Sequence, residues 1–96
     1  MRQFYTYIMA SRSLTLYVGI TSNLFKRVYE HKMKIRKCFT ERYRINKLVY
    51  YEVYDAPIEA IGREKQLKGW RRSRKIALIN NCNPTWSDLA EDWELD

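Results

Sequence analysis

The feature that most constrains the fold is a pair of strand-like segments at the N-terminus. Residues 3–10 (QFYTYIMA) and 15–21 (TLYVGIT) are rich in aromatic and β-branched residues, and a short polar stretch joins them. Two such segments with so short a connection predict a β-hairpin. Because side chains alternate between the faces of a strand, Tyr5 and Tyr7 share one face, which we expect to be exposed. Gly19 lies inside the second strand, where a glycine often marks a close approach to the backbone.

Helix and strand signals alternate over the rest of the chain. Ser22 and Asn23 are good N-cap residues, Pro57 suits the first turn of a helix, and Ser73 can cap another. Residues 80–84 are expected to break the chain. The order is ββαβαα with an optional last helix. The predicted elements after the hairpin are a helix of about three turns from Leu24, an exposed loop over 36–46, a strand over 47–54, and helices over 58–70, 75–79 and 86–93.

The charge of the chain is divided unevenly along its length. All 18 lysine and arginine residues lie between Arg2 and Lys75 with six acidic residues among them, whereas five acidic residues crowd the last nine positions. A cationic body of this kind favours an anionic partner, and nucleic acid comes before an acidic membrane surface. The acidic end either covers the basic surface or faces solvent, and we expect it to face solvent.

Length and composition exclude several classes of protein. A chain of 96 residues forms one domain with one core, so an active site would be a shallow surface groove. No run of about 18 apolar residues predicts a membrane span, and no N-terminal pattern predicts a secretory signal. Cys38 and Cys82 are too few for a disulfide scaffold and lack zinc-site companions. We therefore expect reduced thiols and a cytoplasmic protein with no membrane partner.

Two residue patterns on the predicted helices suit phosphate chemistry. Asn23, Arg27 and His31 follow each other at helical spacing, so a fixed cation and a titratable ring share one face. Glu64 has apolar neighbours one turn away, including Ile61, which places its carboxylate beside the inward face. A carboxylate there needs a partner, either a cation such as Arg27 or a hard metal ion. The plainer interpretations are a solvated helix face and ordinary half-buried sheet tyrosines.

The same residues occur in a set order along the chain. The order is Tyr5-Thr6-Tyr7, then Tyr17-Val18-Gly19, then Arg27, His31 and Glu64. This combination resembles the GIY-YIG nuclease superfamily, and most closely its small stand-alone bacterial members. The resemblance covers about residues 4–86 of a single domain over 1–96 and leaves an acidic segment at 87–96. It implies an α/β (layered α+β) fold with a central three-stranded antiparallel sheet flanked by helices, which agrees with the predicted order.

Carried over position by position, the resemblance implies a catalytic site and a metal ion. Glu64 would hold one Mg²⁺ or Mn²⁺ ion, and Asn83 is the candidate for a late auxiliary asparagine. One of the two motif tyrosines would orient or deprotonate the attacking water, helped by the histidine. The four catalytic residues implied are Tyr7, Tyr17, Arg27 and His31.

The remaining basic residues would bind the nucleic-acid backbone. On and after the predicted helices these are Lys26, Lys32, Arg63, Lys68, Arg71 and Arg72. Nothing looks like a base-reading element, so binding would be structure-selective or non-specific, and salt-dependent. The resemblance thus predicts a metal-dependent endonuclease that hydrolyses phosphodiester bonds in DNA, in repair or recombination. DNA is favoured over RNA, and a separate protein partner would supply specificity.

Two other classes of protein stay open. One is a non-catalytic nucleic-acid-binding module that keeps the same fold. The other is an adaptor that binds a protein through the acidic end, with Trp86 and Trp93. Metal-dependent cleavage of DNA distinguishes the endonuclease from both.

Overall fold

A computed structural model describes residues 2–33 and 44–93, and this part of the chain forms three strands and three helices. The predicted order ββαβαα is confirmed. Most of the loop predicted over 36–46 lies outside the described residues. The strands are β1 (Phe4–Ala10), β2 (Leu16–Thr21) and β3 (Lys47–Tyr54). The helices are α1 (Leu24–Lys32), α3 (Pro57–Gly69) and α4 (Arg72–Cys82).

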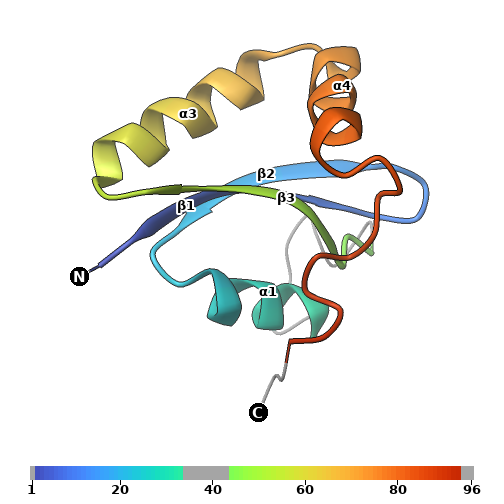
Figure 1. Cartoon of the computed structure of the whole chain (residues 1–96), viewed down its shortest axis with the longest axis horizontal. Helices are drawn as coiled ribbons and strands as arrows, with labels where there is room; N and C mark the ends of the chain where they lie inside the picture. Colours follow the sequence, from blue (N-terminus) through green and yellow to red (C-terminus); the bar gives the residue numbers. More distant parts are fainter. Residues whose placement is uncertain (1, 34–43, 94–96) are drawn as a thin grey trace.

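The three strands form one antiparallel sheet in the order β2-β1-β3. α1 lies on one face of the sheet, and α3 and α4 lie on the other (Figure 1). This arrangement confirms the α/β layered fold with a central three-stranded antiparallel sheet flanked by helices. It also makes β1 the central strand and leaves β2 and β3 as the two edges.

Apolar side chains fill the space on both sides of the sheet. On the α1 face, Tyr7 packs with Val28 of α1, and on the opposite face Ile8 packs with Leu67 of α3 and Ile79 of α4. The expectation that Tyr7 is exposed is therefore wrong, because its exposed fraction is 0%. Alternation along one strand shows which residues share a face, but not whether a later helix covers that face.

Gly19 lies opposite Tyr7 in the β1–β2 pair, and its lack of a side chain makes room for the tyrosine ring. A Cβ atom at this position would lie 2.5 Å from both Cζ and Oη of Tyr7. The close approach predicted at Gly19 is thus made by the ring of Tyr7 itself. The glycine allows the phenol to lie against β2, where it can reach α1.

The starts of α1 and α3 follow the predicted signals. Oδ1 of Asn23 accepts a hydrogen bond from the backbone N–H of Lys26 at 3.0 Å, which caps α1. Pro57 is the first residue of α3, where its missing N–H costs no intrahelical bond. These two helices are therefore positioned by local chemistry.

α4 differs from its prediction at both ends. It begins at Arg72, so Ser73 lies inside the helix and does not cap it. It continues to Cys82, through the predicted break at Asn80. Asparagine is a weak helix former, but burial of Ile79 in the core supplies the stability that the local sequence lacks.

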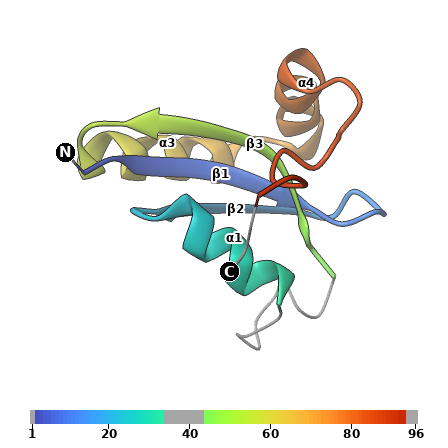
Figure 2. The ribbon, with the colours of Figure 1, turned by 60° about the horizontal axis from the view of Figure 1, so that its bottom comes forward.

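Residues 83–93, which we call the C-terminal strap, run from the end of α4 past β3 to α1 (Figures 1 and 2). The short helix predicted over 86–93 is wrong, because these residues form turns. Oδ1 of Asp88 accepts a hydrogen bond from the N–H of Leu48 at 3.1 Å, and the N–H of Leu89 donates to the Leu48 carbonyl at 2.8 Å. The strap thereby occupies backbone groups that an edge strand otherwise leaves unpaired.

The far end of the strap packs against α1. Asp88 forms an ion pair with Lys32, and the ring of Trp93 stacks on Phe25 with centroids 5.9 Å apart. Ala90 is 1% exposed and belongs to the core on the α1 face. The expectation that the acidic end faces solvent is therefore wrong for Asp88 but holds for Glu91 and Asp92, which are exposed. Ala90 fills part of this core, and the carboxylate of Asp88 pairs with the ammonium group of Lys32.

Candidate active site

Three of the four predicted catalytic residues lie together on the α1 face of the sheet. Oη of Tyr7 and Nε2 of His31 are 3.1 Å apart and share a hydrogen bond. Tyr17 lies against both rings, with its centroid 6.3 Å from that of Tyr7 and 5.3 Å from that of His31. β1, β2 and α1 each contribute one ring to this cluster.

Arg27, the fourth predicted catalytic residue, joins the cluster from the preceding turn of α1. Its guanidinium lies near enough to the Tyr7 hydroxyl to lower the pKa of that group. Its Nε also lies 3.2 Å from Oε1 of Glu30, in an ion pair with 28% and 15% of the two side chains exposed. The alternative that Arg27 pairs with Glu64 is not what the structure shows. The carboxylate beside it comes from its own helix, three residues on.

Burial keeps Tyr7 in its neutral form. Burial raises the pKa of the Tyr7 phenol well above its usual value, and the nearby Tyr17 raises it further. The guanidinium of Arg27 lowers this pKa but does not reverse the shift. Tyr7 is also 0% exposed, so no solvent molecule touches it. Tyr7 is therefore suited to hold His31 and Arg27 in place, and unsuited to accept a proton from water.

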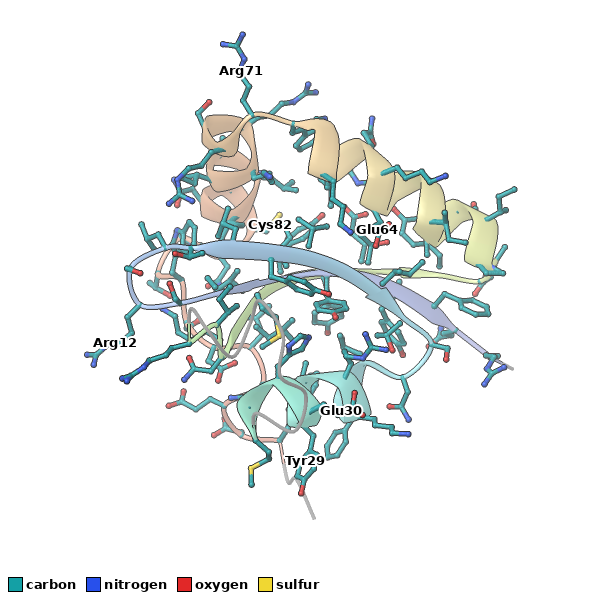
Figure 3. All side chains as sticks on the ribbon, turned by 180° about the vertical axis from the view of Figure 1, so that it is seen from behind. Arg12, Tyr29, Glu30, Glu64, Arg71 and Cys82 are labelled. Carbon is teal, nitrogen blue, oxygen red and sulfur yellow. The ribbon has the colours of Figure 1, made fainter. Side chains whose placement is uncertain are left out.

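Glu64 lies in the other layer of the molecule. It belongs to α3, and Figure 3 shows it on the opposite side of the sheet from Glu30 of α1. Its Oε2 is 3.3 Å from Nζ of Lys68, one helical turn later. The structure thus brings Tyr7, Tyr17, Arg27 and His31 together, but separates Glu64 from them by the sheet.

Glu64 and its neighbour Arg63 point in different directions from α3, because successive helical residues point about 100° apart. Arg63 reaches β3, where its Nε lies 3.0 Å from Oε1 of Glu52, whereas Glu64 pairs with Lys68. Ile61, expected to mark the inward face, is instead 41% exposed, and the buried residues of α3 are Ala60 and Leu67.

The side chains that could bind a divalent ion near Glu64 are few. Among the described residues, no three His, Cys, Asp or Glu side chains are grouped to hold a metal. Mg²⁺ does not need such a group, because it commonly takes one or two carboxylates and fills its shell with water and substrate phosphate. Glu64 offers one half-buried carboxylate, and its partner Lys68 is 54% exposed and can move aside. One hydrated Mg²⁺ or Mn²⁺ ion fits this chemistry.

The predicted nucleic-acid-binding residues have different environments. Lys26 and Arg27 line a polar pocket of about 270 Å³, the cation pocket, together with Arg2, Glu30 and residues 21–23. Arg71 projects into solvent at the connection between α3 and α4 (Figure 3). The other predicted residues are engaged within the protein: Lys32 with Asp88, Arg63 with Glu52, Lys68 with Glu64, and Arg72 with the Leu14 carbonyl.

The basic residues are therefore divided between the two faces of the sheet and do not line one continuous groove. Arg63, predicted to bind the nucleic-acid backbone, is instead held by Glu52, and 22% of its side chain is exposed. Lys26, next to the tyrosine cluster, and the exposed Arg71 retain the open settings that a phosphate contact needs.

Asn83, the predicted auxiliary residue, is 6% exposed and holds the C-terminal strap to β3. Its Nδ2 donates to the carbonyls of Val49 at 3.1 Å and Ser87 at 2.9 Å. Its Oδ1 accepts from both the N–H and the hydroxyl of Ser87. With these bonds the amide group has a structural function at the end of α4.

Three residues at or beside the cluster were not singled out from the sequence. Glu30 was detectable, because a carboxylate three residues after an arginine is a known helical pairing. Arg2 and Asp88 gave no local signal, since each reaches its neighbours only through the tertiary fold. Within the described residues, none of the helices has the length and apolar character that a bilayer crossing requires.

Comparison with known proteins agrees with this fold. The family model described as the GIY-YIG catalytic domain matches residues 3–77. The chain therefore belongs to the GIY-YIG family. That is a family of nucleases, so the protein is placed among enzymes whose substrate is nucleic acid.

Several relatives are equally small proteins. A UPF0213 protein of Syntrophus aciditrophicus is 38% identical over 85 residues, covering 88% of this chain and 97% of the relative. A UPF0213 protein of Staphylococcus saprophyticus is 32% identical over 80 residues, covering 83% of this chain and 98% of the relative. The solution NMR structure of a UPF0213 protein from Bacillus halodurans superposes with a TM-score of 0.59 at 20% identity, covering 94% of this chain and 97% of that chain. That likeness shows the fold.

Proposed function

We propose that this protein is a divalent-metal-dependent endonuclease that hydrolyses phosphodiester bonds in DNA. The observation that carries the proposal is the hydrogen-bonded pair of Tyr7 and His31, with Tyr17 and Arg27 beside it and the cation pocket adjoining it. Hydrolysis of a phosphodiester needs a cation at the phosphoryl oxygens, an oriented water and an acceptor for its proton. This group can supply all three.

The scissile phosphate would bind at the cation pocket. Arg27 suits this task, because its planar guanidinium can donate two parallel hydrogen bonds to phosphate oxygens. Lys26 and Arg2 line the same pocket and add positive charge. As charge develops on the phosphoryl oxygens, the guanidinium held by Tyr7 and Glu30 stabilises it without having to reorient.

The proton of the attacking water would go to His31. Imidazole has a reference pKa of about 6.5, against about 10 for a phenol, and is the better acceptor at neutral pH. In the tautomer whose Nε2–H donates to Oη of Tyr7, Nδ1 carries the lone pair that accepts this proton. The hydrogen bond between Oη and Nε2 fixes the orientation of the ring, which makes Tyr7 a positioning residue. Tyr17 is partly exposed beside it and orients the water. The water oxygen bonds to phosphorus as the bond to the leaving oxygen breaks.

A divalent ion, when bound, supplies positive charge that neutralises the phosphate and its leaving oxygen. Glu64 would hold this ion, which would displace the Lys68 ammonium from the carboxylate. Glu64 and the tyrosine cluster lie on opposite faces of the sheet, so a bound DNA strand would have to pass an edge of the sheet to contact both.

The test is cleavage of labelled flap, branched, single-stranded and paired DNA with Mg²⁺ or Mn²⁺. Glu64→Gln keeps the shape of the side chain and removes its charge, and we expect cleavage to fall by about 100-fold or more. Glu59→Gln is the matched control, because Glu59 is an exposed carboxylate in the first turn of the same helix. We expect Glu59→Gln to cleave like the wild type.

Two results would overturn this function. The first is a folded wild-type protein that binds these DNAs but cleaves none of them with either ion, which would leave the non-catalytic binding module. The second is a Glu64→Gln protein that cleaves as fast as Glu59→Gln. Calorimetric titration of Mg²⁺ into both variants checks the metal separately, since only Glu59→Gln should keep wild-type affinity.

A further inference from the structure

An aromatic groove of about 410 Å³ opens beside the cation pocket on the α1 side of the molecule. This volume lies within the range of about 300–1,000 Å³ that is typical of ligand pockets. None of the roles proposed above uses the groove. Its lining residues are Tyr5, Ser22, Asn23, Leu24, Phe25, Tyr51 and Trp93.

Two aromatic pairs supply most of the apolar surface of the groove. Phe25 and Trp93 are stacked, with an interplanar angle of 11°, whereas Tyr5 and Tyr51 meet edge to face with centroids 6.4 Å apart. Phe25 is 42% exposed and Tyr51 is 40% exposed, so ring faces stay in contact with solvent. Grouped aromatic rings that remain exposed in this way are typical of a binding surface.

The aromatic groove and the cation pocket share a wall. Ser22 and Asn23, between β2 and α1, line both. On one side of this wall lie four aromatic rings, and on the other lie Arg2, Lys26 and Arg27. A nucleotide joins the same two chemistries through one sugar, because it carries a flat π-system and a negatively charged phosphate.

We propose that the aromatic groove binds one unpaired base of DNA while the cation pocket binds the adjoining phosphate. The inference rests on the proposed function and adds a substrate class to it: DNA with an unpaired nucleotide, such as a flap, a bulge or a single strand. A base within a paired duplex is stacked on its neighbours and cannot enter the groove. Aromatic rings accept any base, because every base has a π-face.

Arg27 connects this binding to the chemistry. It lines the cation pocket and also lies near the hydroxyl of Tyr7, which is hydrogen-bonded to His31. A phosphate next to the bound base would therefore lie at the cluster. The C-terminal strap takes part as well, because Trp93 closes one side of the groove. Cleavage would thus occur beside the unpaired nucleotide.

The experiment measures binding without catalysis, by fluorescence anisotropy in EDTA. Two labelled duplexes carry a one-nucleotide bulge at the same position, one with a normal base and the other with an abasic sugar that keeps the phosphate. We expect wild-type protein to bind the bulge with a base roughly tenfold more tightly, since stacking of a base on aromatic side chains is worth about 1–3 kcal/mol.

Substitutions in the groove should remove this preference and leave the affinity for the abasic duplex unchanged. Phe25→Leu and Tyr51→Leu keep an apolar side chain but lose the ring. Tyr51→Phe keeps the ring and should behave like the wild type. Val53→Ala is the control outside the groove, because Val53 is 45% exposed two residues further along β3. Circular dichroism checks that each variant is folded. If Phe25→Leu does not fold, Tyr51→Leu alone provides the test.

Equal wild-type affinity for the two duplexes would overturn the inference, and so would a preference that survives both leucine substitutions. In the latter case the groove would be a surface for another kind of molecule, such as a protein. Cleavage of the bulged duplex by the wild type in Mg²⁺ is measured in parallel. A protein that cleaves but shows no base preference refutes the groove alone, whereas one that prefers the base but never cleaves refutes the proposed endonuclease alone.

Discussion

Replacement of Gly19 by alanine is the sharpest test of how the tyrosine cluster is assembled. The added Cβ would lie 2.5 Å from Cζ and Oη of Tyr7 and 2.9 Å from its Cε1. Tyr7 cannot turn away without cost, since it is 0% exposed and bonded to His31. Overpacking of this kind costs about 1–3 kcal/mol.

Part of this cost is offset by the backbone. A glycine within a strand is about 0.5–1 kcal/mol less favourable than an alanine, and Gly19 has no positive φ that would strain an alanine. The net loss in the free energy of unfolding is therefore about 0–2.5 kcal/mol. For a domain of this size, a mid-range loss of about 1 kcal/mol lowers the melting temperature by roughly 4–8 °C.

The same substitution at Gly62 is the matched control. Gly62 lies in α3, is exposed, and has nothing within 4 Å of an added Cβ. Gly62→Ala should therefore stabilise the protein by about 0.5–1 kcal/mol, so the two glycines respond with opposite sign. Thermal and urea unfolding measure both effects.

Catalysis should be more sensitive than stability. A tyrosine displaced by about 1 Å no longer holds His31 and Arg27 in place, and a shift of that size commonly costs about 100-fold in rate. Tyr7→Leu removes the atoms that clash, so the Gly19→Ala/Tyr7→Leu double variant should lose less stability than the sum of its parts. Strict additivity, or a Gly19→Ala protein as stable as Gly62→Ala, would refute the reasoning.

Two further predictions concern the contacts that hold α3 and the C-terminal strap. Burial opposes ionisation of Glu52, but hydrogen bonds from Arg63, Tyr50 and Tyr54 outweigh it and keep the pKa of Glu52 below its ordinary value. This contribution to stability is present above about pH 5 and is lost as the pH falls through the lowered pKa. Glu52→Gln should therefore lower the free energy of unfolding at pH 7 and flatten its decline toward pH 3, as measured by urea unfolding. An unchanged decline would contradict this account. Asp88→Ala should lower the free energy of unfolding by about 1.5–3 kcal/mol in thermal unfolding, because it removes the acceptor of two backbone N–H groups. Asp88→Asn keeps an acceptor and should lower it less. Equal losses for the two variants would show that the ion pair dominates.

Elements with strong local signals could be predicted from the sequence. The alternating aromatic runs predict the hairpin, and Asn23 and Pro57 mark the starts of α1 and α3. α4 and the C-terminal strap were predicted less well. Their backbone is decided by contacts with β3 and α1, to which Asn83 and Asp88 supply the hydrogen bonds. No local pattern records such a contact.

The candidate site divides in the same way. Spacing alone brings Arg27 and His31 to one side of a helix, and the strand pairing brings Tyr7 and Tyr17 near each other. The sequence did not indicate that Tyr7 is buried and neutral, nor that Glu64 lies beyond the sheet. These facts depend on which helix covers which face.

By itself, then, the sequence determined the order of the elements, the family and the identity of the clustered residues, because short-range periodicity and capping are properties of neighbouring residues. The tertiary structure alone decided the rest. Packing of α1 over β1 converted an apparently exposed tyrosine into a buried positioning group. Docking of the strap turned an acidic end into the wall of an aromatic groove beside three cations. Both depend on long-range burial, which rewards contacts between residues that are far apart in the chain.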